Sequence, residues 1–124
     1  VLEPECLKRS HLVLTTYNVV ASKSEKKGPL FRAKWHRVVL DEAHTIKNRT
    51  SATAKACWSL PGDCRWCLTG TPIQNGLLDV FPLVKFVGVE PFDDIEWFNR
   101  TIVRPAKSRQ VEGLERLKLL LKYY

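Results

Sequence analysis

Residues 35–44 read Trp-His-Arg-Val-Val-Leu-Asp-Glu-Ala-His, and this stretch decides the fold that the sequence predicts. Its first part, residues 35–40, is an apolar and β-branched run that predicts a strand. The run stops abruptly at two acids, Asp41 and Glu42. Because open parallel sheets bind their ligands just outside the carboxyl ends of the strands, we expect both acids at a ligand-binding edge. A solvated acid pair that merely closes a strand is the competing interpretation.

The order of residues after this strand is typical of nucleotide hydrolysis. An Asp at this point can hold a Mg²⁺ ion that bridges the β- and γ-phosphates of a nucleotide, directly or through water. The next side chain points in another direction, so a Glu there can orient and deprotonate the attacking water. His44 follows one turn later, close enough to report the state of the site to neighbouring segments. The complete string Asp-Glu-Ala-His is rarer than an acid pair and favours this interpretation.

A second signal lies downstream, at Thr69, Gly70 and Thr71. Residues 65–68 (Arg-Trp-Cys-Leu) predict a short strand that ends in this Thr-Gly-Thr turn. Its hydroxyls and exposed backbone groups would lie beside the acids of the adjacent strand, where they could sense a γ-phosphate. An ordinary turn containing Gly and Pro is the alternative.

Strand and helix patterns alternate over the first part of the chain. Residues 11–16 (His-Leu-Val-Leu-Thr-Thr) predict a further buried strand, and residues 21–34 predict a polar, basic surface loop. Thr50 or Ser51 can cap a helix that ends before a Pro-Gly pair at residues 61–62. This alternation argues for an α/β fold with a parallel sheet.

The pattern changes to helices beyond Gly76. Pro82 either kinks the first of these helices or begins a new one. Asp93 or Asp94 can cap the next helix. The last helix carries three leucines at helical spacing, which predict its buried face: Leu114, Leu117 and Leu121.

Composition limits the partners of the chain. Lys and Arg number 20 against 13 Asp and Glu, which gives a formal net charge of +7. This balance favours a polyanionic partner, either nucleic acid or an anionic membrane surface, although many basic proteins bind neither. No run of about eighteen apolar residues predicts a membrane span, and we expect no membrane partner.

The four cysteines do not predict a disulfide framework, because nothing in the sequence indicates a secreted context. A reducing, intracellular location is expected instead. Cys64 and Cys67 have the spacing of a zinc-ligand pair, but a structural zinc needs four ligands and no second pair follows. A cysteine-based metal protein is therefore a third and weaker alternative. The sequence contains no Met, which we interpret as the mark of a piece of a longer protein.

Three stretches together resemble one protein family. Residues 35–48 look like motif II of the Swi/Snf-related branch of helicase superfamily two, and residues 65–75 resemble motif III of that branch. Residues 14–17 are similar to its motif Ib, a contact to the backbone of the tracking DNA strand. DEAH RNA helicases share the Asp-Glu-Ala-His string, but typically carry Ser-Ala-Thr in place of the Thr-Gly-Thr found here. The Trp-x-Arg before the strand and residues 100–105 (Arg-Thr-Ile-Val-Arg-Pro) look closest to the group of helicase-like transcription factors and post-replication-repair proteins.

The resemblance implies a fold and a function. The fold would be α/β, a partial RecA-like parallel sheet of the P-loop NTPase type with flanking helices and an all-helical C-terminal part. Residues 1–124 would form the C-terminal portion of the N-terminal ATP-binding lobe, from motif Ib to motif III, ending before the second lobe. The parent protein would be a nuclear, ATP-dependent double-stranded DNA translocase of the chromatin-remodelling or DNA-repair type. Its cofactors would be ATP and Mg²⁺, and its partners double-stranded DNA, chromatin and its own second RecA-like lobe.

The resemblance also implies roles for eight residues. Asp41 would bind Mg²⁺, and Asp41 and Glu42 together would form the cofactor site. Glu42 would be the catalytic base, and His44, also placed at the catalytic site, would help to couple hydrolysis to movement on DNA. ATP hydrolysis would be coupled to movement on DNA through Thr69, Gly70 and Thr71. The DNA backbone would be contacted by Thr15 and Thr16.

One element of the family is missing from the sequence. No Gly-x-x-x-x-Gly-Lys-[Ser/Thr] loop occurs in the 124 residues, and such a loop would cradle the phosphates with its backbone amides. We therefore expect the isolated chain to hydrolyse no ATP. The alternative function is a non-catalytic DNA- or partner-binding module derived from such a lobe, and the sequence upstream of residue 1 would separate the two.

Overall fold

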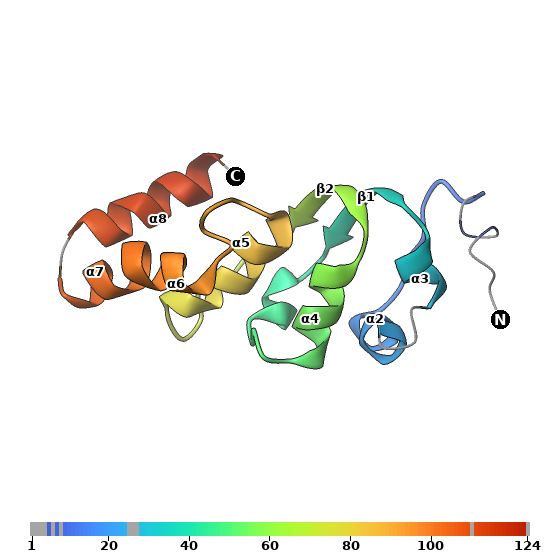
Figure 1. Ribbon diagram of the computed structural model, residues 1–124, viewed down its shortest axis with the longest axis horizontal. Helices are drawn as coiled ribbons and strands as arrows, with labels where there is room; N and C mark the ends of the chain where they lie inside the picture. The colour runs from blue at the N-terminus through green and yellow to red at the C-terminus, as the bar shows by residue number, and fades with distance from the viewer. Residues whose placement is uncertain (1–4, 6, 8, 25–27, 110, 124) are drawn as a thin grey trace.

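The computed structural model describes residues 5, 7, 9–24, 28–109 and 111–123. The molecule is elongated, and a small sheet lies in its middle (Figure 1). Short helices lie at the N-terminal end of the long axis, the helix Ala52–Ser59 lies next to the sheet, and the helices beyond Gly76 form the C-terminal end. The predicted α/β class with an all-helical C-terminal part is confirmed.

The described part of the chain forms one sheet of two strands, β1 (Trp35–Leu40) and β2 (Gly62–Cys67). The strands are parallel, and their register runs from Trp35 opposite Gly62 to Leu40 opposite Cys67. A Cβ atom on Gly62 would lie 2.7 Å from Cγ2 of Val38, so only glycine fits this close start of β2. The predicted parallel pairing of the two motif-bearing strands is confirmed.

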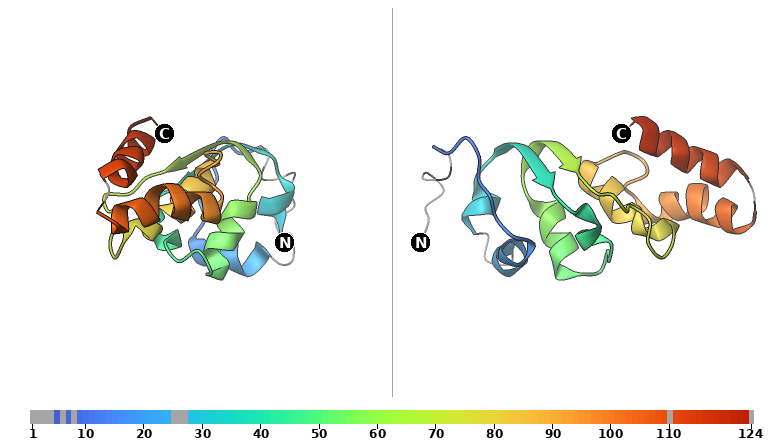
Figure 2. Two further views of the ribbon diagram at one scale, coloured as in Figure 1. Left: turned by 60° about the vertical axis from the view of Figure 1, so that its left-hand side comes forward. Right: turned by 180° about the vertical axis from the view of Figure 1, so that it is seen from behind.

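The two faces of the sheet have different surroundings. Val38 and Leu40 are buried against helices, whereas Val39 and Trp66 on the opposite face are 44% and 51% exposed. The guanidinium of Arg37 stacks 4.4 Å above the ring of Trp66 on that exposed face. Among the described helices, α2 (Tyr17–Ser24) and α4 (Ala52–Ser59) cover the buried face (Figures 1 and 2).

Two predictions for the N-terminal third are wrong. Residues 11–16 form no strand, and Leu12 and Leu14 are 75% and 85% exposed. A strand requires a neighbouring strand for its backbone hydrogen bonds, and neither β1 nor β2 pairs with this segment. The loop predicted over residues 21–34 instead contains the end of α2 and the short helix α3 (Pro29–Arg32), while residues 25–27 lie outside the described part.

The helix between the strands ends and begins where its capping residues predict. The Oγ atom of Ser51 accepts a hydrogen bond from the backbone N–H of Ala54 at 3.1 Å, which caps α4. The helix ends at Ser59, just before the Pro-Gly pair. Between Glu42 and α4, the chain makes the 3₁₀ helix η1 (Ala43–Ile46).

The described elements of the C-terminal part are all helices, which turns connect. Its elements are η2 (Leu77–Asp79), α5 (Phe81–Val87), α6 (Ile95–Phe98), the π-helical η3 (Asn99–Val103), α7 (Arg104–Lys107) and α8 (Val111–Tyr123). Pro82 lies in the first turn of α5, where it does not interrupt a hydrogen bond of the helix. Asp94 caps α6, because its Oδ1 atom accepts the N–H of Trp97 at 2.9 Å. No described helix is both long enough and apolar enough to span a bilayer.

Helix α8 buries a different face from the one its leucines predict. Leu117 and Leu120 are buried, whereas Leu114 and Leu121 are 46% and 48% exposed. Gly113 explains the rotation, because it is buried where α8 lies against η3 and α7. A Cβ atom at this position would lie 2.6 Å from two backbone atoms of those segments, so a glycine lets the helices touch.

The buried side chains form two clusters that share α5. The first cluster joins the sheet, η1 and α4 to Leu83 and Phe86 of α5. The second cluster joins α6, η3 and α8 to Phe81 and Val84 of α5 and to Val80, which directly precedes that helix. Val87, the last residue of α5, packs against both clusters.

Candidate active site

The parallel pairing brings the two predicted motifs to one edge of the sheet. The backbone N–H of Leu68 donates to the carbonyl of Leu40 at 2.8 Å, and the N–H of Ala43 donates to the carbonyl of Leu68 at 2.9 Å. Asp41 and Glu42 therefore leave β1 beside the point where Thr69 leaves β2.

Glu42 has an unusual backbone conformation. Its φ is 48° and its ψ is 51°, in the left-handed region that costs a non-glycine residue about 1 kcal/mol or more. The carbonyl of Glu42 accepts hydrogen bonds from the N–H and the hydroxyl of Thr45, at 2.9 and 2.8 Å. The Glu42 side chain is 70% exposed and therefore accessible to a ligand at the sheet edge.

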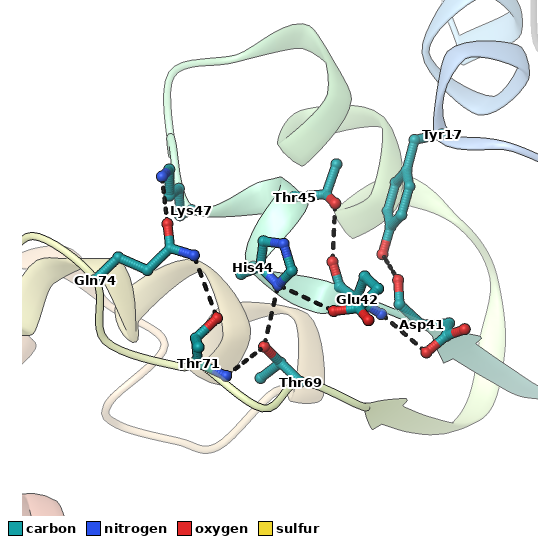
Figure 3. Close-up of polar contacts among 9 residues, drawn as sticks. All are labelled: Tyr17, Asp41, Glu42, His44, Thr45, Lys47, Thr69, Thr71 and Gln74. Atoms are coloured by element: carbon teal, nitrogen blue, oxygen red, sulfur yellow. Dashed lines mark hydrogen bonds and ion pairs between the residues drawn. The ribbon is translucent and has the colours of Figure 1, made fainter.

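His44 connects the two motifs through one ring nitrogen. Its Nδ1 atom lies 3.3 Å from Oε2 of Glu42 and 3.3 Å from the hydroxyl oxygen of Thr69 (Figure 3). A ring nitrogen that carries its proton can donate to the carboxylate, and one without a proton can accept from the threonine hydroxyl. The position of the proton on His44 therefore decides which of the two motifs it holds more strongly.

The turn after β2 is held by side chains from both motifs. The hydroxyl oxygen of Thr69 accepts the N–H of Thr71 at 3.2 Å, and the hydroxyl oxygen of Thr71 accepts from the Gln74 amide at 3.2 Å. The ammonium of Lys47 donates to the other end of that amide, which returns the connection to the first motif (Figure 3). Gly70 is exposed within this turn.

Asp79 fixes the same turn from its far side. One carboxylate oxygen accepts the backbone N–H groups of Gln74, Asn75 and Gly76, at 3.0, 2.7 and 3.4 Å. These hydrogen bonds, with that from Asn75 the largest cause, lower the pKa of Asp79 below its ordinary value. No sequence signal used above identified Asp79, because its role depends on where the turn folds back.

Tyr17 belongs to the stretch that resembles motif Ib, but its contact with the acid pair was not predicted. Its hydroxyl donates to the backbone carbonyl of Asp41 at 2.7 Å, across 24 residues of chain (Figure 3). The N–H of Glu42 donates to Oδ1 of Asp41 at 3.0 Å. Burial raises the pKa of Tyr17 above its usual value, so the hydroxyl keeps its proton as a donor.

The two predicted DNA contacts lie at the start of α2. Thr15 and Thr16 are both exposed. The hydroxyl oxygen of Thr16 accepts the N–H of Val19 at 3.3 Å, so Thr16 caps the helix and Thr15 has the freer side chain of the two. The structure places this segment next to the acid pair through Tyr17.

Asp41 fits a magnesium ion that arrives with a nucleotide. Among the described residues, no three His, Cys, Asp or Glu side chains are grouped to hold a metal ion. Mg²⁺ commonly takes only one or two protein carboxylates and completes its shell with waters and substrate phosphates. The exposed Asp41 carboxylate at the strand end meets that need, and Glu42 is its neighbour.

The cysteine pair is not arranged as metal ligands. Cys64 and Cys67 lie three residues apart on β2, so their side chains point to opposite faces of the sheet. Cys67 packs against the first cluster, and burial raises its pKa to about 12. A thiol that stays protonated is a poor metal ligand and a poor nucleophile.

A parallel sheet with acids and a Thr-Gly-Thr turn at its carboxyl edge defines the class, and the chain belongs to the SNF2-related domain family. The family matches residues 1–124. The chain is 45% identical over 122 residues to "Helicase-like transcription factor" of Homo sapiens, which covers 97% of the chain and 12% of that protein. It is 38% identical over 125 residues to "DNA repair protein RAD5A" of Arabidopsis thaliana, covering 97% of the chain and 12% of that protein.

A solved structure supports the same assignment. The chain superposes on the Sulfolobus solfataricus SWI2/SNF2 ATPase core in complex with double-stranded DNA with a TM-score of 0.76 and 28% identity. The match covers 95% of the chain and 25% of that protein. The resemblance predicted from the motifs, including its subgroup, is confirmed. The chain spans about one eighth of the length of these two curated relatives.

Proposed function

We propose that residues 1–124 are the C-terminal portion of the N-terminal RecA-like lobe of an ATP-dependent double-stranded DNA translocase. The observation that carries this proposal is the contact of His44 with both Glu42 and Thr69 at one sheet edge. The family and the SWI2/SNF2 neighbour support it. The second RecA-like lobe, a nuclear location and a role on chromatin or in DNA repair belong to the same proposal.

In this proposal, the chain's residues divide the work of hydrolysis. Asp41 would hold the Mg²⁺ ion of a bound nucleotide, and that ion would neutralise charge on the phosphates. Glu42 accepts a proton from the attacking water, and its exposed carboxylate has the freedom to do so. His44 holds the Glu42 carboxylate and, through its contact with Thr69, transmits a change in the position or charge of that carboxylate. The hydrogen bonds of Thr69 and Thr71 then transmit that change through the turn.

The test of the catalytic base uses Glu42→Gln in the full-length protein. Glutamine keeps the size of the side chain but accepts no proton, so we expect ATP binding to persist and turnover to fall by about 10²-fold or more. Nucleotide affinity and steady-state ATP hydrolysis with double-stranded DNA measure the two quantities. Glu115→Gln, at an exposed position on α8, is the matched control. Undiminished turnover in Glu42→Gln would remove the base assignment, whereas absence of ATP turnover in the unmodified full-length protein would favour the non-catalytic binding module.

The test of the DNA contact uses salt. A chain with a net charge of +7 that contacts phosphates should bind double-stranded DNA with an affinity that falls steeply as salt rises. We expect Thr15→Ala to weaken binding about two- to tenfold, because it removes one hydrogen bond to phosphate. Since the threonine is neutral, the salt slope should not change. Unaltered affinity in Thr15→Ala would exclude this threonine from the interface.

A further inference from the structure

The peptide that joins Asp41 to Glu42 has partners for both of its polar groups. Its carbonyl accepts the hydroxyl of Tyr17 at 2.7 Å, and its N–H donates to Oδ1 of Asp41 at 3.0 Å. The residue that follows this peptide, Glu42, has the left-handed backbone described above. A peptide plane next to a strained residue keeps its orientation only where its surroundings fix it. Tyr17 is the part of those surroundings that comes from a distant segment of the chain.

Tyr17 itself has a fixed position. Its ring packs against the first buried cluster, together with residues of β1 and α4. Helix α2, which begins at Tyr17, packs along α4, and Val20 in its middle is only 4% exposed. The hydroxyl is therefore delivered to the Asp41 carbonyl by a packed ring and not by a freely rotating side chain.

The start of α2 also joins Tyr17 to the proposed DNA contact. Thr16 immediately precedes Tyr17, and it holds the first turn of α2 through the N–H groups of Val19 and Val20. A displacement of Thr15 and Thr16 would thus displace Tyr17 with the same helix turn. Only one hydrogen bond then separates this segment from the peptide between the two acids.

We infer that Tyr17 is a positioning residue that sets the orientation of Glu42 and makes it depend on the segment at Thr15 and Thr16. This inference rests on the proposed function of Glu42 as the base. The tyrosine touches neither nucleotide nor water in this role. It acts through the Asp41 carbonyl. When the segment at Thr15 and Thr16 contacts the DNA backbone, Tyr17 aligns the Glu42 carboxylate.

The experiment is Tyr17→Phe in the full-length protein, with ATP turnover measured with and without double-stranded DNA. Phenylalanine keeps the packed ring and removes only the donor. We expect kcat with DNA to fall about five- to fiftyfold, because a misaligned base costs more than the one hydrogen bond lost. KM for ATP should stay within about twofold, since the phosphate contacts of other segments are untouched. The ratio of DNA-stimulated to DNA-free turnover should fall as well.

Two controls make the result decisive. Tyr123→Phe, at an exposed position on α8, should leave turnover and DNA stimulation unchanged. Thermal unfolding of Tyr17→Phe should be close to that of the parent protein. Full DNA stimulation in Tyr17→Phe would overturn the inference, and so would a loss of folding that accounts for the lost activity. If Glu42→Gln retains turnover, the proposed function fails instead, whatever Tyr17→Phe does.

Discussion

The Nδ1 atom of His44 lies 3.3 Å from the hydroxyl oxygen of Thr69, although 25 residues separate them in the chain. The parallel register of β1 and β2 produces this contact, because it ends both strands at the same level. His44 also lies beside Glu42, so this side chain links the acid pair to Thr69 (Figure 3). In the proposed function, the hydroxyl of Thr69 is therefore the group of the second motif through which a change at the acid pair is transmitted.

Thr69→Val should therefore reduce translocation along DNA more than it reduces ATP hydrolysis. Valine keeps the branched shape and removes the oxygen that contacts His44 and accepts the N–H of Thr71. In the full-length protein, we expect DNA-stimulated ATP hydrolysis to fall less than tenfold and translocation to fall at least tenfold. Displacement of a third strand from triplex DNA measures translocation. Thr53→Val on α4 is the control, and equal losses in both activities would contradict a coupling role.

Asp79→Asn should loosen the turn that carries Thr71. The carboxylate accepts three backbone N–H groups, and its pKa is lowered below the ordinary 3.8. A lowered pKa in the folded state adds stability above the unfolded-state value, and this is lost as the pH falls through the folded-state value. We expect Asp79→Asn to cost about 1 kcal/mol in the free energy of unfolding at pH 7. The difference should shrink below about pH 4 in urea titrations, and a difference independent of pH would contradict the charged form.

Gly113→Ala should disrupt the packing of α8. The new methyl group would lie 2.6 Å from the N atom of Ala106 and from the carbonyl oxygen of Ile102. Neither backbone atom can move without shifting its helix, so we expect a loss of about 2–3 kcal/mol in the free energy of unfolding. Gly76→Ala is the matched control, because its Cβ position is open and its φ is extended at 175°. Equal stability of the two variants would contradict the close approach.

The stability of the fold should decline in alkali as its buried cysteines titrate. Burial raises the pKa of Cys57 to about 11 and that of Cys67 to about 12, from an ordinary 9.0. A raised pKa means that the stabilisation is complete below pH 9 and is lost as the pH rises through 11 to 12. Replacing both cysteines by alanine should lower stability at pH 8 but flatten this decline, with a residual slope from Tyr17. Guanidinium unfolding at a series of pH values measures both effects, and an unchanged slope would contradict the assignment.

The sequence predicted the site edge because the signals for it are local. Each motif is a short strand that ends in polar residues, and parallel strands place such ends together. Ser51 and Asp94 were predicted as candidate caps for the same reason, since a cap bonds to the backbone a few residues away. The structure confirms these positions. The roles given to the site residues themselves stay predictions until their variants are measured.

The sequence failed where distant contacts decide the structure. Residues 11–16 have the composition of a strand, but a strand also needs a neighbour, and Leu14 is exposed here. The end of α2, residues 21–24, was predicted as part of a loop because a polar sequence does not reveal that this helix packs on α4, where Val20 is buried. Tyr17 donates a hydrogen bond to a carbonyl 24 residues away in the chain. Gly113 packs against the backbone of two neighbouring helices. No pattern within a short window contains that information.

Helix α5 has one consequence for how the whole chain loses its structure. Two small interiors would ordinarily melt one after the other, each at its own temperature. Here the residues of a single two-turn segment belong to both, with Phe86 on one side and Phe81 on the other. Breaking either interior exposes the apolar surface that the other one needs. Sheet and C-terminal helices are therefore thermodynamically inseparable, and a single cooperative transition should account for both.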